Sequence, residues 1–319
     1  MLYERKWAIY LTYYNKYSFE YIKYPLVYYL GLFPYCTLFI YLSLNYSNIT
    51  KENKLDIGIS IDKFISEKGE KEFTSYIEQF FVGLLEGDGT ITVDYLSDRK
   101  KRVRIFIALN NLEDNRFMLD LVVRYIGGRV AIERNDRYVT WYATNRTDLA
   151  KIFAILARYP LLSTRKQCQL DFAKDFINST KDISKEEFLK LRDAKYKTQK
   201  TMLYLYDKNF GLPLYFSGWL SGFIESEGHF KLVKTANNTI KSSQFIIGQN
   251  NEKHLLKAIL TYFNLDSNKI STTLNKEGVI YYKIHLGGKD SRSLLASHFN
   301  SYPLLGDKWT KYQKWVNNH

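Results

Sequence analysis

The chain has 319 residues and carries 46 lysines and arginines against 33 acidic residues, a formal net charge of +13 at pH 7. This charge favours a polyanionic partner such as nucleic acid, although membrane-surface proteins are also basic. The two cysteines, Cys36 and Cys168, are too few for a disulfide framework or a structural zinc site. The glycine pairs that begin at Gly127 and Gly287 lack P-loop spacing, so no small-molecule substrate is expected.

The first 70 residues form a hydrophobic extension and linker with no counterpart later in the chain. No charged residue occurs between Tyr24 and Thr50. Leu26 to Leu44 is long enough for a membrane span, although a glycine and a proline interrupt it. Two interpretations stay open: a membrane anchor or import segment, or an upstream extension that is removed or left unfolded. Mixed charges then predict a linker from Lys51 to Lys71.

A nine-residue motif occurs twice in the chain. FVGLLEGDG spans Phe81 to Gly89, and LSGFIESEG spans Leu220 to Gly228, 139 positions later. Apolar residues before and within each copy recur at i, i+3, i+4, i+7 and i+8. This period predicts an amphipathic helix for each copy.

Each predicted helix carries two small residues four positions apart. They are Gly83 and Gly87 in the first copy, and Gly222 and Ser226 in the second. Such a strip has almost no side chain, which lets two helix backbones approach closely. We therefore predict that the two motif helices pack against each other.

The acid near the end of each motif, Asp88 or Glu227, points to metal binding. The C-terminal end of a helix is negative, and an acid there is disfavoured by about 0.3 to 1 kcal/mol. If the helices pair in parallel, the two carboxylates also repel each other. A divalent cation removes both penalties, and two carboxylates with backbone carbonyls and water suit Mg²⁺. The adjacent residues Gly87 and Ser226 complete the candidate metal site.

The two motifs resemble the signature of the double-motif LAGLIDADG homing endonucleases and the related intron maturases. The resemblance implies an α+β fold with two pseudo-symmetric αββαββα halves. Their antiparallel sheets would form a DNA-binding saddle, with the paired motif helices at its centre. The halves would span residues 71–179 and 215–319, joined by an inter-half linker at 180–214. In that family the acid at the eighth motif position binds the catalytic metal, which matches Asp88 and Glu227.

The sequence after each motif continues in parallel. Two strands follow each copy, and the second strands end in FIALN and FIIGQ, which places Asn110 opposite Gln249 at the same spacing of 139. A helix, two more strands and a helix ending in YPLL come next, with the tyrosines at 159 and 302. That spacing is 143, so the second half has gained four residues in between.

The resemblance assigns further catalytic roles. Family members commonly carry a lysine five residues after the proline of YPLL, near the scissile phosphates, and Lys308 stands there in the second half. Arg165 holds this position in the first half, with Lys166 beside it, so two cations are candidates. An arginine could stabilise negative charge but would be a poor proton donor. Asn110 and Gln249 match polar positions that help order water near the metals.

The outer faces of the predicted sheets are candidates for DNA contact. Residues two apart on a strand share a face, so Val103, Ile105 and Ile107 would face the core. The opposite face can lie in a major groove, where Arg and Lys read guanine. In the first half it offers Thr90, Thr92, Asp94, Arg102, Arg104, Phe106, Thr140, Tyr142 and Thr144. In the second half it offers His229, Lys231, Lys241, Ser243, Tyr281, Lys283 and His285. Because the two sets differ, the target would be asymmetric.

Taken with the resemblance, these features predict a monomeric, Mg²⁺-dependent endonuclease. It would hydrolyse double-stranded DNA at a long site and leave short 3′ overhangs. Intron-encoded family members indicate the mitochondrion, with the chloroplast as the alternative. A second function stays open, that of a maturase that binds its host intron RNA and assists splicing, with or without cleavage. Retention of both Asp88 and Glu227 favours cleavage.

Overall fold

The structure is a computed structural model that describes residues 57–96, 100–177, 179, 182–276 and 278–317. All of these residues belong to one compact unit, Thr50–His319. The hydrophobic stretch from Leu26 to Leu44 lies outside the described residues. Within the described ranges, no helix combines the length and the apolar character needed to cross a membrane.

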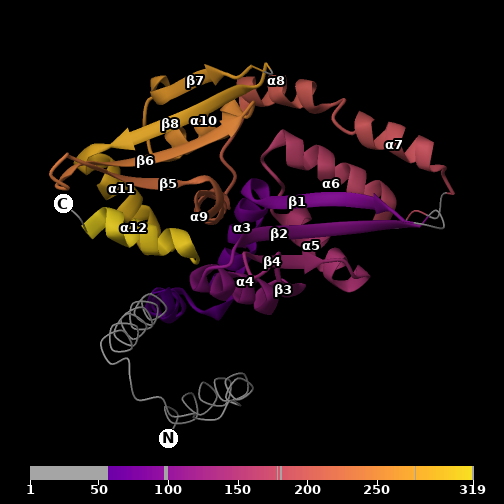
Figure 1. The fold of residues 1–319 in the computed structure, drawn as a ribbon, viewed down its shortest axis with the longest axis horizontal. Coiled ribbons are helices and arrows are strands. Elements are labelled where there is room, and N and C mark those ends of the chain that lie inside the picture. Colours follow the sequence, from indigo (N-terminus) through magenta and orange to yellow (C-terminus); the bar gives the residue numbers. More distant parts are fainter. Residues whose placement is uncertain (1–56, 97–99, 178, 180–181, 277, 318–319) are drawn as a thin grey trace, which may run out of the picture. The chain divides into compact units, whose positions relative to one another are not determined.

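Two copies of one arrangement follow each other along the chain (Figure 1). The first comprises α3 (Glu70–Gly87), β1 (Gly89–Tyr95), β2 (Lys101–Asn110), α4 (Glu113–Tyr125), β3 (Arg129–Glu133), β4 (Tyr138–Ala143), α5 (Arg146–Arg158) and α6 (Thr164–Ile177). The second comprises α9 (Phe216–Glu227), β5 (His229–Lys234), β6 (Ile240–Asn250), α10 (Lys253–Tyr262), the short η2 (Ser267–Lys269), β7 (Ile270–Leu274), β8 (Ile280–Gly287), α11 (Gly288–Ser301) and α12 (Asp307–Asn317). The predicted αββαββα order is confirmed, and each half adds one helix at its end.

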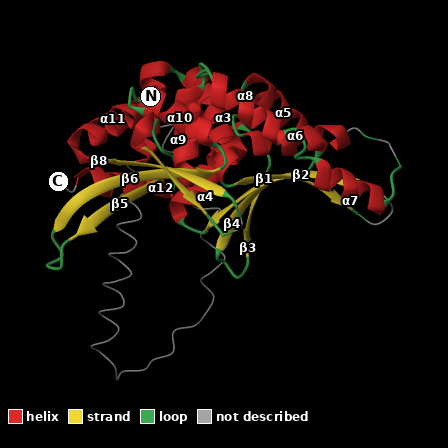
Figure 2. Cartoon of the chain, turned by 90° about the horizontal axis from the view of Figure 1, so that it is seen from above, coloured by secondary structure: helices red, strands yellow, loops and turns green. Residues whose placement is uncertain are grey.

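Each half contains one four-stranded antiparallel sheet. The strand orders are β1-β2-β4-β3 and β5-β6-β8-β7, so the two sheets have the same topology. In β2, Val103, Ile105 and Ile107 are buried and the residues between them are not. Figure 2 shows α5, α6, α10 and α11 on one side of the strands. The helices therefore cover the apolar face of each sheet and leave the polar face uncovered by them.

The motif helices α3 and α9 pack against each other in parallel. A Cβ atom on Gly83 would lie 1.9 Å from the carbonyl oxygen of Trp219, and one on Gly222 would lie 1.8 Å from that of Phe80. Nothing larger than hydrogen fits between backbones this close. The glycine strips thus bring the C-terminal ends of both motifs together.

The predicted linker between Lys51 and Lys71 differs from the structure, because residues 57–68 are helical. Ile57, Ile61 and Phe64 lie on one face of this helix and are buried. The ring of Phe64 stacks on Tyr76 of α3, with 5.1 Å between centroids. These three apolar residues are spaced by four and three positions, which is typical of an amphipathic helix. The charged residues between them made this spacing easy to overlook in the sequence.

The connector between the halves forms two helices, α7 (Lys185–Ala194) and α8 (Gln199–Asn209). In α7 only Phe188 is buried, and its ring lies 5.4 Å from that of Tyr95 and 5.6 Å from that of Phe176. No residue of α8 is buried. The charged sequence of this segment is thus explained by solvated helices, which contact the first half through Phe188 and through hydrogen bonds such as those of Tyr206 to Gln167 and Gln199 to Thr164.

His298 of α11 is buried and neutral. Ser221 donates its hydroxyl hydrogen to the carbonyl oxygen of Tyr302 at 2.7 Å, so at its 2.9 Å contact with His298 Nε2 it accepts. The other ring nitrogen, Nδ1, then accepts from the Tyr262 hydroxyl at 3.0 Å. Burial lowers the pKa of His298 to about 3.

We expect His298 to make the fold acid-sensitive. Below pH 6.5 the unfolded chain binds a proton at this residue that the folded chain does not, so stability rises with pH between about 3 and 6.5. The free energy of unfolding should fall by up to about 1.4 kcal/mol per pH unit as the pH drops through this window. Urea titrations between pH 7 and 5 measure this slope. In the His298→Gln variant, the free energy of unfolding should depend less on pH than in the wild type. An equally strong pH dependence in the variant would contradict the assignment to His298.

Candidate active site between the two halves

Two acids meet where the helix pair ends. Asp88 directly follows α3, and Glu227 is the last residue of α9. A Cβ atom on Gly87 would lie 1.9 Å from Ser226 Oγ and 3.1 Å from Glu227 Cγ, so the two helix ends are in contact. Asp88 is exposed and Glu227 is half-buried, which leaves both carboxylates accessible to a ligand. The structure thus brings together the two acids singled out in the sequence.

The two acids share one electrostatic environment. Desolvation raises the pKa of Asp88, while the charges of Lys308 and Lys166 oppose this shift. The pKa of Glu227 is also raised, first by desolvation and then by the charge of Asp88, while a hydrogen bond from Gln249 lowers it. Holding both acids ionised is therefore costly, and a cation between them would remove that cost.

One lysine from each half occupies an equivalent position beside the acids. Lys166 Nζ donates to the carbonyl oxygen of Gly89, and Lys308 Nζ donates to that of Gly228. These glycines end the two motifs, 139 positions apart, so the lysines are structural counterparts. Burial lowers the pKa of Lys166 to about 8, and the charge of Arg165 acts in the same direction. Burial also lowers the pKa of Lys308.

Arg165 does not lie with these lysines. Its side chain is exposed and hydrogen bonds to Tyr196 of the connector. Consecutive residues of a helix point about 100° apart, so Arg165 and Lys166 in the first turn of α6 cannot both face the acids. Of the two first-half candidates, the structure favours Lys166.

A second acid in each motif escaped the sequence analysis. Glu86 and Glu225 are 3% and 5% exposed, and burial raises the pKa of each to about 7. Glu86 accepts from the amides of Leu162 and Ser163 at 2.5 and 2.6 Å, just before α6. Glu225 likewise accepts from the Lys308 amide at 2.9 Å in α12. Each fixes the helix that carries a lysine. In both motifs this glutamate stands two positions before the acid of the candidate site, and that recurrence was a signal in the sequence.

The second strand of the second half is shifted by one residue. Thr90 pairs with Phe106, while its counterpart His229 pairs with Ile246, which is 140 rather than 139 positions after Phe106. The second hairpin therefore holds one extra residue. A register shift of one residue exchanges the two faces of a strand.

Because of this shift, Asn110 and Gln249 are not structural counterparts. At the offset of 140, Asn110 corresponds to Asn250, and both end their strands. Gln249 instead lies on the opposite face, where it hydrogen bonds to Glu227. The two residues expected to act alike therefore have different surroundings, and only Gln249 contacts an acid of the site.

The first-half residues predicted to face DNA lie on the face of the sheet away from the helices. On β1, Thr90, Thr92 and Asp94 alternate with the buried Ile91 and Val93. On β2 the outward positions are Arg102, Arg104 and Phe106, and on β4 Tyr142 shares their face. Asp94 pairs with both arginines, at 3.2 and 3.1 Å, which orients their guanidinium groups.

Thr140 and Thr144 depart from this expectation. Thr140 is 1% exposed, because Glu133 of β3 lies over it and accepts from its hydroxyl at 3.1 Å. Glu133 also accepts from Tyr142. Thr140 is therefore not available for DNA contact in this conformation. Thr144 lies one residue past the end of β4.

In the second half, the prediction for Ser243 of β6 is wrong because of the register shift. Ser243 is 3% exposed and accepts from Arg292 of α11 at 3.2 Å, so it faces the helices. Lys241 lies at an irregularity where the pairing passes from Ser242 to Ile240. Gln244 lies on the opposite face, where it pairs with Lys231 of β5. The other outward residues have the expected exposure; they are His229, Lys231, Tyr281, Lys283 and His285.

The donor set at the helix ends fits a hard divalent cation. No cluster of three or more His, Cys, Asp or Glu residues suited to a metal occurs among the residues that the structure describes. An ion at this place would be held by Asp88 and Glu227, with the Gly87 carbonyl, water and phosphate as further oxygen ligands. Ser226 is less suited, because its hydroxyl donates to the Phe223 carbonyl at 2.9 Å and its own carbonyl lies 3.5 Å from Lys308 Nζ.

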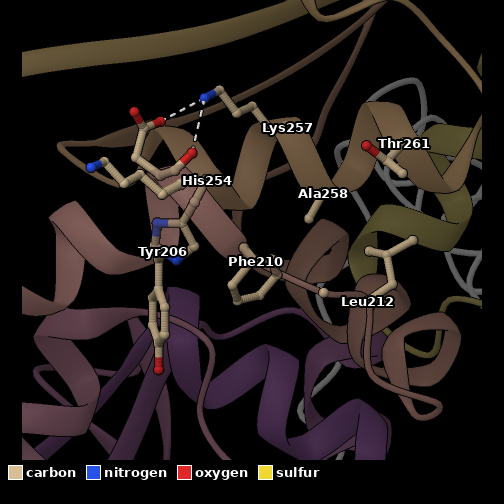
Figure 3. A pocket seen from close by; sticks show the side chains of 10 residues that line it. Tyr206, Phe210, Leu212, His254, Lys257, Ala258 and Thr261 are labelled. Carbon is tan, nitrogen blue, oxygen red and sulfur yellow. Dashed lines mark hydrogen bonds and ion pairs between the residues drawn. The ribbon is translucent and has the colours of Figure 1, made fainter.

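A cavity of about 450 Å³ lies elsewhere, between α8 and α10 (Figure 3). Tyr206, Phe210 and His254 line it, and Lys257 closes one side through a 2.6 Å ion pair with Asp207. None of the acids or lysines of the candidate site is among its lining residues. The cavity is thus separate from the acids and lysines at the helix ends.

The chain is similar to proteins of one family. A family model described as LAGLIDADG endonuclease matches residues 81–176 and 220–319, one copy in each half. A probable intron-encoded endonuclease aI3 of Dictyostelium citrinum is 32% identical over 248 residues, which cover 76% of this chain and 96% of that protein. A protein of the same description from Debaryomyces hansenii is 29% identical over 269 residues. That match covers 76% of this chain but only 38% of the longer relative.

The fold is also similar to solved structures. The LAGLIDADG homing endonuclease I-GzeII, solved in complex with its DNA target, superposes with a TM-score of 0.55 at 17% identity. The superposition covers 75% of this chain and 88% of that one. At this identity the likeness concerns the fold.

Proposed function

The chain belongs to the LAGLIDADG endonuclease family, and on that premise we propose that it is a site-specific homing endonuclease that cuts double-stranded DNA with Mg²⁺. One observation carries the proposal. Asp88 and Glu227, one from each half, meet at the ends of the paired helices, and each precedes a glycine whose carbonyl binds a lysine. A pair of equivalent sites suits the cutting of two strands.

The residues at this site would have different roles in cleavage. Asp88 and Glu227 would hold the cation, and Gln249 orients the Glu227 carboxylate by its hydrogen bond. When bound, Mg²⁺ acts as a Lewis acid on phosphoryl oxygen and lowers the pKa of water. Lys166 and Lys308 stabilise negative charge on the phosphate. Because burial lowers the pKa of Lys166 to about 8, its Nζ can also give a proton to the leaving oxygen near neutral pH.

The uncovered faces of the two sheets would bind the duplex. They carry arginine and threonine in the first half and lysine, histidine and tyrosine in the second, so the target should be long and asymmetric. Both motifs lie in one chain, which supports action as a monomer. Short 3′ overhangs and a mitochondrial location are further parts of the proposal that come from family resemblance. Cleavage is favoured over a purely RNA-binding maturase role because both acids are present and meet.

A library selection tests this function. The full chain is incubated with randomised duplex DNA and Mg²⁺, and the ends of the cut molecules are sequenced. We expect one enriched, non-palindromic sequence with short 3′ overhangs, and no cutting in the presence of EDTA. The matched control is the double variant Asp88→Asn, Glu227→Gln. Equal enrichment by this control and by wild type would contradict the proposed function.

A further inference from the structure

The start of helix α6 is held by carboxylates from both halves of the molecule. The amides of Leu162 and Ser163 donate to Glu86 of the first half. The next two amides, of Thr164 and Arg165, donate to a different acid, Glu252, at 3.2 and 3.1 Å. Four successive amides at the start of α6, including three that a helix start leaves without an intrahelical partner, are therefore bound by two carboxylates.

Glu252 belongs to the second half, immediately before α10. It is 3% exposed, and it also accepts from the Thr164 hydroxyl at 2.8 Å. His254 adds a second contact from the same helix, donating from Nε2 to the Leu162 carbonyl at 3.0 Å. A buried carboxylate with three hydrogen bonds at the positive end of a helix fixes that end firmly.

The segment fixed in this way carries the first-half lysine. Lys166 follows Arg165 directly, and its Nζ binds the carbonyl of Gly89, the residue after Asp88. A small displacement of the α6 start would move this ammonium group away from the acids. The geometry of the first-half cation thus depends on an acid of the second half.

The start of α12, which carries Lys308, is held by a different set of contacts. At α12 the amides of Leu305, Gly306 and Lys308 all donate to Glu225, which belongs to the same half. From the first half, Asn115 Oδ1 accepts from the Asp307 amide at 3.1 Å, and Asp114 accepts from the Thr310 hydroxyl at 2.8 Å. The carboxylate that binds the amides at the start of α12 thus belongs to the same half as Lys308, whereas a carboxylate of the other half also binds the amides at the start of α6.

We propose that Glu252 is a positioning residue for Lys166, so that an acid of the second half sets cleavage of the strand served by the first-half cation. This rests on the proposed nuclease function. Loss of Glu252 should impair one strand selectively, although the residue touches neither acid of the active site. The two halves would then be coupled through this helix start as well as through α3 and α9.

The first test measures the chemical accessibility of the two lysines and needs no DNA. The full chain is acetylated with acetic anhydride at pH 8, and the rates at Lys166 and Lys308 are followed by mass spectrometry. Glu252→Ala should raise the rate at Lys166 by about threefold or more relative to Lys308, because the lysine is released from its contact. Glu252→Gln keeps one acceptor oxygen and should be intermediate; it also carries the test if the alanine variant does not fold. Equal changes at both lysines, or none, overturn the proposal.

Glu78→Ala is the matched control. Glu78 is also a buried carboxylate, 7% exposed, but it pairs with Arg158 at 2.6 Å. Its loss should lower stability while leaving the ratio of the two acetylation rates unchanged. A shift of this ratio by Glu78→Ala would mean that general loosening explains the effect, and would overturn the assignment to Glu252.

The second test measures the cleavage rate of each strand separately, on the duplex recovered from the library selection. Lys166→Met identifies the strand that depends on the first-half cation. Glu252→Ala should slow that strand by about tenfold or more and leave the other within about twofold. Equal slowing of both strands overturns the positioning role and leaves the nuclease proposal standing. A wild-type chain that cuts nothing overturns the nuclease proposal, and the acetylation ratio still decides whether Glu252 positions Lys166.

Discussion

Replacing Asp88 by asparagine, or Glu227 by glutamine, should abolish double-strand cleavage and leave DNA affinity nearly unchanged. Each change removes one of two carboxylates that would hold the cation while keeping the size of the side chain. We expect the rate on one strand to fall by about 1,000-fold, as when one electrostatic stabiliser of a transition state is lost. Affinity depends mainly on basic and polar contacts across the sheets, which neither change touches.

The measurement follows both strands of the selected duplex with different end labels. Each single variant should accumulate a nicked product, and the two variants should differ in which strand stays intact. Binding without added metal should be equal to wild type or slightly tighter, because a negative charge that faces phosphate is gone. Double-strand cutting at the wild-type rate by both variants would refute the assignment of the acids.

The central helix pair was predictable from the sequence because its signal is local. Small residues at a spacing of four, inside an apolar helical period, specify a close crossing whatever surrounds them. Gly83 and Gly222 stand at backbone distances that only glycine permits. The family match confirms the resemblance drawn from the same residues.

The outward and inward faces of the strands could be predicted only where the two halves share the same strand register. In the first half, parity placed Arg102, Arg104 and Phe106 on the outer face. In the second half, one extra residue in the hairpin reversed the faces, and Ser243 became buried. The motif spacing of 139 gave no sign of it, because the insertion and the later gain of residues both lie after the second motif.

The carboxylates that cap the start of α6 could not be predicted from the sequence of either repeat alone. The choice between Arg165 and Lys166 depends on the rotation of α6, which is fixed by acids at its start. One of these, Glu252, comes from the other half of the chain. An internal repeat predicts contacts within each copy, whereas a contact between copies becomes visible only in three dimensions.

Alanine at Gly222 or Gly83 should have the largest effect on stability in this chain. The added methyl groups would meet the carbonyl oxygens of Phe80 and Trp219 at 1.8 and 1.9 Å. These are backbone atoms of packed helices, so no side chain can rotate away, and the helices must separate. Overpacking costs typically 1–3 kcal/mol, and here we expect the upper end, about 3 kcal/mol for each change. The midpoint of thermal unfolding should fall by roughly 10 °C.

The same substitution at a glycine with free space provides the control. A Cβ atom on Gly58, in the helical residues 57–68, meets nothing within 4 Å. Alanine is favoured over glycine inside a helix by about 1 kcal/mol, so Gly58→Ala should raise the unfolding midpoint. Opposite signs for one chemical change would separate the steric cost of the crossing from helix propensity. Gly222→Ala should also slow cleavage of both strands, because parting the helices parts Asp88 from Glu227. A stable, fully active Gly222→Ala variant would show that the acids do not depend on the close crossing.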